Sequence, residues 1–84
     1  MWHLYMLRLE DDSLYTGITK NVERRLKQHR EGNGSKYVRS RLPFRLVYKE
    51  KIGSRSEALK KEAEIKSWRK EEKEEYIENY EEAR

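Results

Sequence analysis

The segment Tyr15–His29 constrains the fold of this 84-residue chain more than any other part of the sequence. It begins with a Tyr-Thr-Gly tripeptide at residues 15–17, in which a strand-like tyrosine leads into a glycine turn, and it continues from Val22 with the spacing of a helix. Asn21 precedes that helix and is a good N-cap, because its side-chain oxygen can accept a free backbone N–H of the first turn. The segment therefore predicts a strand joined to a helix by a short connection.

The apolar residues before this segment predict a partner for its strand. Trp2–Leu9 is mostly aromatic and aliphatic, and the polar residues 10–13 separate it from Leu14–Ile18, so the two form an expected antiparallel hairpin. The other expected elements are a helix at Val22–Arg30, a helical turn at Lys36–Arg41, a strand at Phe44–Tyr48, a helix from the Ser54–Glu57 capping box to about Trp68, and a last helix at about Glu71–Tyr80. This order, β-β-α-β-α-α, predicts one small α+β domain over residues 1–84, with a three-stranded antiparallel sheet flanked by helices.

Composition excludes several classes of protein. Only 35% of the residues are hydrophobic and 43% are charged, so the core must be small. The chain contains no cysteine, which excludes disulfides and cysteine-based metal sites and favours a cytoplasmic location. Met1–Arg8 is too short and lacks the basic start of a signal peptide. No segment approaches the roughly 20 apolar residues of a membrane-spanning helix, so no membrane partner is expected.

Charge is distributed unevenly along the chain. Residues 1–70 contain 18 Lys and Arg against 9 Asp and Glu, whereas residues 71–84 contain 2 Lys and Arg against 7 Glu. Between Lys20 and Lys49 there are ten basic residues and two acidic ones. This pattern indicates one face for a polyanion such as a nucleic acid and an acidic last helix that is merely solvated, although basic surfaces are also common in proteins that bind no nucleic acid.

Two polar side chains lie on or beside the inward face of the helix at Val22–Arg30. Val22 and Leu26 define that face, and at roughly 100° per residue His29 falls on it while Arg25 falls on its flank. In the simplest alternative, Arg25 is an ordinary surface residue. His29 would then serve as a favourable charge at the helix C-terminus.

The helix that follows Ser54 repeats the pattern. Ala58, Leu59 and Ile65 mark its expected inner face, and Glu62 falls among them. A buried carboxylate is costly unless it is paired, hydrogen-bonded or bound to a metal. Either Glu62 forms an internal salt bridge with Arg25, or both helices border a shared polar cleft.

Four separated motifs resemble the GIY-YIG nuclease superfamily over nearly the whole chain, from Trp2 to about Lys70. They are His3-Leu4-Tyr5 and Tyr15-Thr16-Gly17 on the two strands, the spacing of Gly17, Arg25 and His29, and the stretch from Ser56 to Lys66 around Glu62. In addition, the stretch from Ser35 to Tyr48 is similar to short, single-domain, uncharacterised bacterial members. The first tripeptide carries His3 where the family has glycine, and the second carries Thr16 where it has isoleucine.

The resemblance implies a metal-dependent endonuclease that hydrolyses phosphodiester bonds at a one-metal site. Its implied catalytic residues are Tyr5, Tyr15, Arg25, His29 and Glu62, and Gly17 is implied as a structural member. Glu62 would bind Mg²⁺ or Mn²⁺, and Arg25 would bind the scissile phosphate. Tyr5 is favoured as the base, with Tyr15 positioning water or phosphate and His29 assisting, although all three are candidates for the base. The tyrosines could also be ordinary strand aromatics.

Binding of nucleic acid, with DNA favoured over RNA, is expected to come from basic residues of the same region. They are Lys20, Arg24, Lys27, Arg30, Lys36, Arg39 and Arg41. Contacts to backbone phosphates position a duplex but carry no sequence information, so recognition of branched or otherwise structured DNA is expected. The alternatives are a non-catalytic nucleic-acid-binding module and a subunit that needs a protein partner for targeting.

Overall fold

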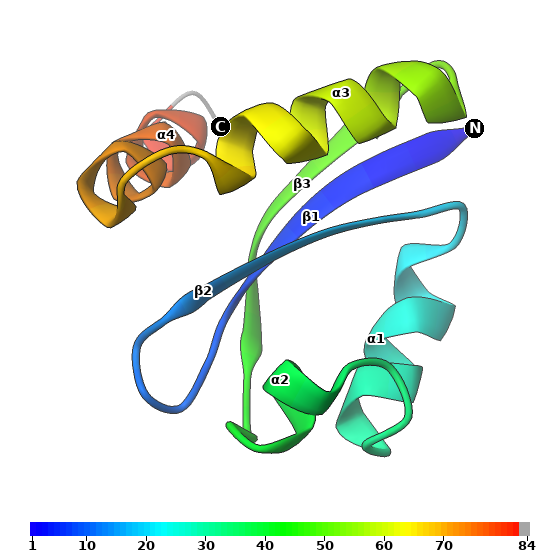
Figure 1. The fold of residues 1–84 in the computed structure, drawn as a ribbon, viewed down its shortest axis with the longest axis vertical. Helices are drawn as coiled ribbons and strands as arrows, with labels where there is room; N and C mark the ends of the chain where they lie inside the picture. The colour runs from blue at the N-terminus through cyan, green and yellow to red at the C-terminus, as the bar shows by residue number, and fades with distance from the viewer. Residues whose placement is uncertain (83–84) are drawn as a thin grey trace.

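The computed structural model describes residues 1–82 of the chain and contains a three-stranded antiparallel sheet with helices on both faces (Figure 1). Its elements in chain order are β1 (Trp2–Arg8), β2 (Leu14–Thr19), α1 (Val22–Arg30), α2 (Lys36–Arg39), β3 (Arg45–Ile52), α3 (Arg55–Lys66) and α4 (Lys70–Glu82). The predicted α+β fold and the predicted element order are thus confirmed.

Strand β1 is the centre of the sheet, because β2 pairs with one of its edges and β3 with the other. The β1–β2 register sets Tyr5 opposite Gly17 and Leu7 opposite Tyr15. The β1–β3 register shifts by one residue after Met6, which is the mark of a bulge. The central position explains why β1 is apolar along nearly its whole length: both of its faces are covered.

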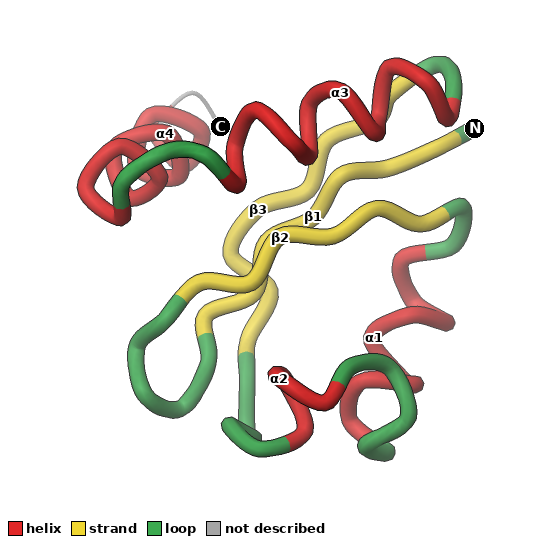
Figure 2. Tube along the Cα trace, viewed as in Figure 1, coloured by secondary structure: helices red, strands yellow, loops and turns green. Residues whose placement is uncertain are grey.

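The sheet separates two hydrophobic cores, because successive side chains of a strand point to opposite faces. On one face, α3 and α4 complete a core of Leu4, Met6, Tyr48, Ile52, Ala58, Ile65 and Ile77. On the other face, α1 and α2 complete a core of Tyr5, Leu7, Leu9, Leu26 and Val38. Figure 2 shows the sheet between these two groups of helices, with α3 and α4 on one side and α1 and α2 on the other.

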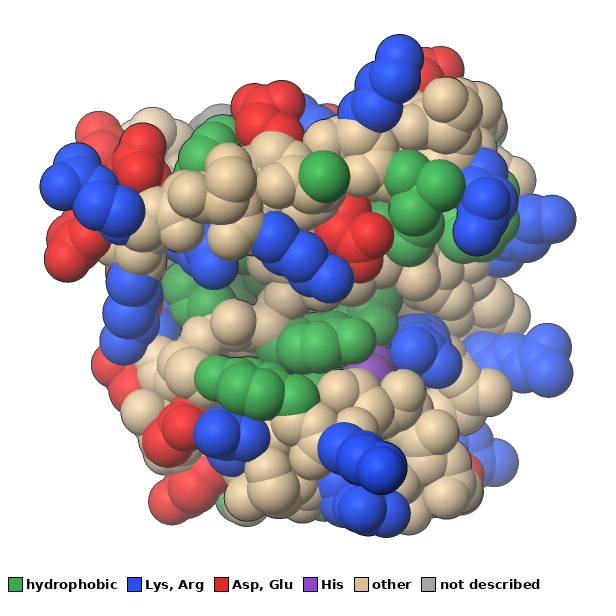
Figure 3. All heavy atoms as spheres, viewed as in Figure 1, with side chains coloured by type: hydrophobic (Ala, Val, Ile, Leu, Met, Phe, Trp, Pro, Cys, Tyr) green, Lys and Arg blue, Asp and Glu red, His purple; other side chains and the backbone are tan. Residues whose placement is uncertain are grey.

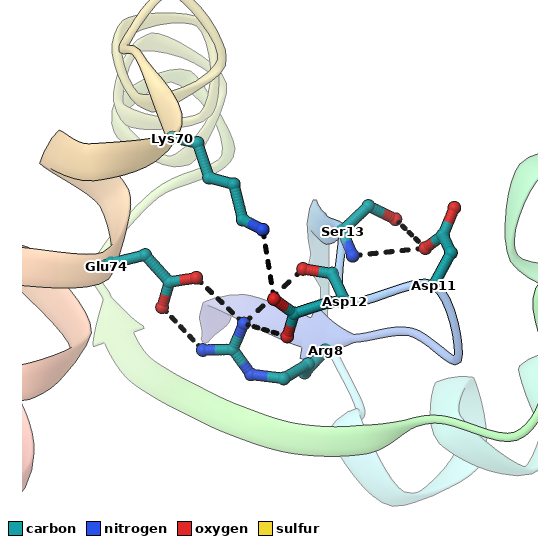
Figure 4. A network of polar contacts seen from close by, with 6 residues as sticks. All are labelled: Arg8, Asp11, Asp12, Ser13, Lys70 and Glu74. Atoms are coloured by element: carbon teal, nitrogen blue, oxygen red, sulfur yellow. Dashed lines mark hydrogen bonds and ion pairs between the residues drawn. The ribbon is translucent and has the colours of Figure 1, made fainter.

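An ionic cluster ties α4 to the hairpin (Figure 4). The Arg8 guanidinium donates to both carboxylate oxygens of Glu74, at 2.8 and 2.5 Å, and to the Asp12 carboxylate at 3.1 Å. The Lys70 ammonium also lies 3.2 Å from the Asp12 carboxylate. The charge pattern predicted that the acidic last helix is merely solvated, and this is wrong. Glu74 on α4 binds the partly buried Arg8 at the end of β1.

Two sequence expectations are corrected. The third strand continues beyond Tyr48 to Ile52, because the alternation persists, with Lys49 and Lys51 exposed and Ile52 buried. Leu59 does not lie on the inner face of α3, where it was expected, and is 38% exposed. The inner face of α3 follows Ala58 and Ile65 instead, with Glu62 between them.

Candidate active site

The Tyr5 hydroxyl is the centre of the candidate site, and Gly17 makes room for it. The two residues pair across the β1–β2 ladder. A Cβ atom on Gly17 would lie 2.6 Å from the Tyr5 hydroxyl oxygen and 2.7 Å from Cζ. The tyrosine ring therefore crosses the backbone of β2 at a point where only glycine fits.

His29 is fully buried on α1 and binds the same hydroxyl. Its Nε2 atom lies 2.8 Å from the Tyr5 oxygen, while Nδ1 has no hydrogen-bond partner among the described residues. Burial, together with the nearby charge of Arg25, lowers the pKa of His29 to about 4. The imidazole is therefore neutral at physiological pH, so the alternative in which His29 acts as a cation at the helix end is wrong.

Arg25 lies beside this pair with its charge uncompensated. Its Nε donates to the Tyr5 hydroxyl at 3.4 Å, and its two terminal nitrogens donate to the Gln28 side chain at 3.1 Å and to the Gly34 carbonyl at 3.3 Å. All three acceptors are neutral groups, and Arg25 makes no salt bridge within residues 1–82. Arg25 is thus held in place and keeps a full charge for an anionic ligand.

Burial raises the pKa of Tyr5 to about 12. The hydrogen bond and positive charge of Arg25 oppose this rise, whereas the Tyr15 hydroxyl and the Glu62 carboxylate add to it. Two conclusions follow. The phenol keeps its proton at neutral pH, and Arg25, Tyr15 and Glu62 all lie near enough to act on one oxygen atom.

Aromatic rings surround the Tyr5–His29 pair. Tyr15 packs edge-on against His29, with ring centroids 5.4 Å apart, and stacks on Tyr37 at 6.4 Å. Tyr37 is 43% exposed and was not predicted as a site residue. Gly34 was also missed: it accepts from Arg25, and a Cβ there would overlap Nδ1 of His29. The two glycines in the loop at residues 32–35 are the only sequence signal for this contact.

Glu62 approaches from α3, which packs across β1 and β2 from the other face of the sheet. Its side chain is 19% exposed, and its carboxylate pairs with Lys66 at 3.3 Å. The alternative of a structural Arg25–Glu62 salt bridge is therefore wrong. Figure 3 shows a hollow between α3 and the α1–α2 side of the molecule, with hydrophobic side chains on its floor and Lys and Arg side chains around it.

The basic residues predicted to bind nucleic acid differ in their surroundings. Lys20 and Arg24 line a cavity of about 360 Å³ together with Arg25. Four others are exposed on or beside α1 and α2, namely Lys27, Arg30, Lys36 and Arg39. Arg41, in contrast, pairs with Asp11 at 2.8 Å, and its guanidinium covers the Tyr37 ring at 3.8 Å from the centroid. Its charge is largely compensated within the chain.

The described residues include no group of three or more His, Asp or Glu side chains that could hold a metal ion. They also include no helix that is both long enough and apolar enough to cross a bilayer. A protein-only metal cage is thus absent from residues 1–82, and Glu62 is the carboxylate that acts electrostatically on the Tyr5 hydroxyl.

Comparison with known proteins identifies a family and similar sequences. Residues 1–76 match the family described as the GIY-YIG catalytic domain. The chain is 45% identical to a UPF0213 protein of Staphylococcus haemolyticus over 76 residues. This alignment covers 90% of this chain and 93% of that protein. The chain is 46% identical over 76 residues to a UPF0213 protein of Haloquadratum walsbyi, covering 90% of this chain and 85% of that protein.

Solved structures are similar as well. The solution NMR structure of the UPF0213 protein from Bacillus halodurans matches with a TM-score of 0.61 and 42% identity, over 93% of this chain and 84% of that chain. The solution NMR structure of a protein from E. faecalis matches with a TM-score of 0.65 and 38% identity, over 94% and 84% of the two chains. The resemblance inferred from the four motifs is confirmed.

Proposed function

The chain belongs to the family of GIY-YIG catalytic domains, and from this premise we propose that it hydrolyses phosphodiester bonds in DNA with the help of one divalent cation. The observation that carries the proposal is the set of groups around a single oxygen. An uncompensated Arg25 and a neutral His29 both contact the buried Tyr5 hydroxyl, and the Glu62 carboxylate adds a smaller electrostatic effect. A structural role alone does not explain why Arg25 is held in place by neutral acceptors with no counter-ion among residues 1–82.

Arg25 and Tyr5 have separable roles in this proposal. The guanidinium would bind the non-bridging oxygens of the scissile phosphate, because it is preorganised by Gln28 and Gly34 and lacks a counter-ion. Tyr5 would accept the proton of the attacking water, and for this its own proton must first pass to Nε2 of His29, 2.8 Å from the hydroxyl oxygen. In the free protein the pKa values of Tyr5 and His29 are about 12 and about 4, so the proton stays on Tyr5. Its transfer would require positive charge beyond that of Arg25.

Mg²⁺ or Mn²⁺ fits the donor set, with Glu62 as its one protein ligand and water or substrate oxygens as the others. Magnesium commonly binds through one or two carboxylates and keeps several waters, so a single carboxylate suffices. The Lys66 ammonium already pairs with Glu62 at 3.3 Å, so a bound ion would have to displace it or share the carboxylate with it. When bound, the ion would polarise the phosphate and stabilise the leaving 3′ oxygen.

Exposed cations supply the proposed contacts to the nucleic-acid backbone. Lys20 and Arg24 share a cavity with Arg25, so they would lie nearest to the phosphate. Lys27, Arg30, Lys36 and Arg39 would contact phosphates farther along the strand. A preference for DNA over RNA, a protein partner that directs the domain, and a cytoplasmic location remain predictions from the sequence.

The decisive experiment is cleavage of branched and linear DNA and RNA in Mg²⁺ or Mn²⁺. We expect Glu62→Gln and Arg25→Ala each to lower the rate by on the order of 10²–10³. Glu64→Gln is the matched control, because it removes an exposed carboxylate two residues away on the same helix.

Two outcomes would contradict the proposal. If both variants cut as well as the wild type, the observed activity belongs to a contaminant. If the wild type cuts no substrate with either metal but still binds DNA in a salt-dependent way, the domain is a binding module that keeps the family's fold.

A further inference from the structure

A cavity at the end of β2 extends the candidate site in one direction. It has a volume of about 360 Å³, and its lining includes Trp2, Lys20, Asn21, Arg24, Arg25 and Gln28. This volume is at the lower end of the range for small-ligand pockets, roughly 300–1,000 Å³. Because Arg25 also contacts the Tyr5 hydroxyl, the cavity begins at the proposed position of the scissile phosphate.

The cavity combines an aromatic wall with uncompensated positive charge. The Lys20 ammonium lies 5.7 Å from the centroid of the Trp2 ring, and the Arg55 guanidinium lies 5.8 Å from it. Neither cation, nor Arg24, forms a salt bridge within residues 1–82, whereas Lys61 and Lys66 on α3 both do. Trp2 is only partly buried, so part of its ring remains accessible from the cavity.

An indole ring with free cations around it is suited to one class of ligand. A nucleobase stacks on an aromatic face whatever its sequence, and the adjoining phosphates need positive charge. A base that replaced the Lys20 ammonium over Trp2 would release that ammonium to the next phosphate. A purely hydrophobic ligand would form no ion pair with Lys20, Arg24 or Arg25, and inorganic phosphate would not stack on the Trp2 ring.

We propose that the cavity lined by Trp2, Lys20, Arg24 and Arg25 binds the base of an unpaired nucleotide next to the phosphodiester that Arg25 holds. This inference rests on the proposed function and specifies its substrate. A base inside a duplex is stacked on both sides and paired, so it cannot enter the cavity. The domain would therefore prefer single strands, or junctions that expose a single-stranded segment, to continuous duplex.

Tryptophan fluorescence tests the proposal directly, because the chain has two tryptophans. In the Trp68→Phe background Trp2 is the only one. We expect its emission to be quenched by a short single-stranded oligothymidylate and much less by a hairpin duplex with the same number of phosphates. Both titrations are done in a chelator, so that no strand is cut, and on a chain with no added residues before Met1.

Affinity measurements with variants of Trp2 complete the test. Trp2→Leu should weaken binding of the single strand by about 5- to 150-fold, the effect of losing one stacked base, and leave duplex binding nearly unchanged. Trp2→Tyr should keep most of the affinity, because it keeps an aromatic face. Trp68→Leu is the matched control, since Trp68 lies on the α4 side. Since Trp2 also packs on a core, thermal unfolding of each variant must show that it is folded.

The outcomes separate this inference from the proposed function. Equal affinity for both oligonucleotides, with no change in Trp2 emission, would overturn the base-binding cavity even if the wild type cleaves DNA. Quenching that depends on Trp2, in a protein that cleaves nothing, would support the cavity and refute the hydrolysis. Failure to bind any oligonucleotide would overturn both.

Discussion

Replacement of Gly17 by alanine tests the packing at the centre of the candidate site. The new Cβ would lie 2.6 Å from the Tyr5 oxygen, and contacts below 3.0 Å are essentially never seen, so the atoms must separate by at least 0.4 Å. Tyr5 is 1% exposed and cannot move into solvent. Its hydroxyl is also held by His29 at 2.8 Å. The added methyl group must therefore distort either the hydrogen bond or the strand.

Two opposing effects set the size of the change. Overpacking of a filled core costs about 1–3 kcal/mol. A Gly→Ala change also restricts the unfolded chain, which stabilises by about 0.4–1 kcal/mol. The first effect is larger, so Gly17→Ala should lower the free energy of unfolding. For a domain of this size each 1 kcal/mol corresponds to about 4–8 °C in Tm.

Chemical denaturation and cleavage assays measure the two consequences. Gly53→Ala is the matched control, because its Cβ would meet only a Glu57 oxygen at 3.8 Å, so this variant should be neutral or slightly more stable. Gly17→Ala should also lose about 10²-fold in rate, as expected when a reacting group is misplaced by up to about 1 Å. If Gly17→Ala is as stable and as active as the wild type, the Tyr5 ring does not cross β2 as described.

Three further predictions concern His29, Gly34 and Glu74. Because the pKa of His29 is about 4 when folded and about 6.5 when unfolded, the unfolded chain binds the extra proton between these values. Stability should therefore fall more steeply in the wild type than in His29→Phe as pH drops from 6.5 to 4, as urea titrations at several pH values would measure; parallel curves would refute this. Gly34→Ala should destabilise by about 1–3 kcal/mol, because its Cβ overlaps the buried His29 ring, and a two-dimensional NMR spectrum should show shifts at His29; unchanged imidazole resonances would argue against that overlap. Chiefly through its hydrogen bonds to Arg8, the pKa of Glu74 is lowered, so its stabilisation is present above the unfolded pKa of about 4.3 and is lost as pH falls through the folded value. Glu74→Gln should therefore cost about 0.5–1 kcal/mol at pH 7 and progressively less as pH falls below the unfolded pKa, and a loss that does not change with pH would mean that Glu74 acts by packing.

Local patterns were enough to predict the elements and part of the site. The hairpin followed from the short turn between two apolar runs, and α1 began after Asn21, whose side chain accepts the Arg24 amide as the capping rule requires. His29 and Glu62 stood out because each interrupts an apolar helical face. Such polar residues can be recognised in a sequence, because burying a polar side chain costs free energy unless a hydrogen bond, an ion pair or a metal compensates it.

The order of the elements, the two inward-facing polar residues His29 and Glu62, and the family to which the motifs belong all follow from the amino-acid pattern. Which groups meet in space follows from the packing of the folded chain. This packing left Arg25 without a carboxylate partner among residues 1–82, paired Arg41 with Asp11, and set the Tyr5 hydroxyl against His29. Helical and strand periodicity act over a few residues, whereas the Arg41–Asp11 and Tyr5–His29 contacts join segments far apart in the chain that meet only when the helices pack on the sheet.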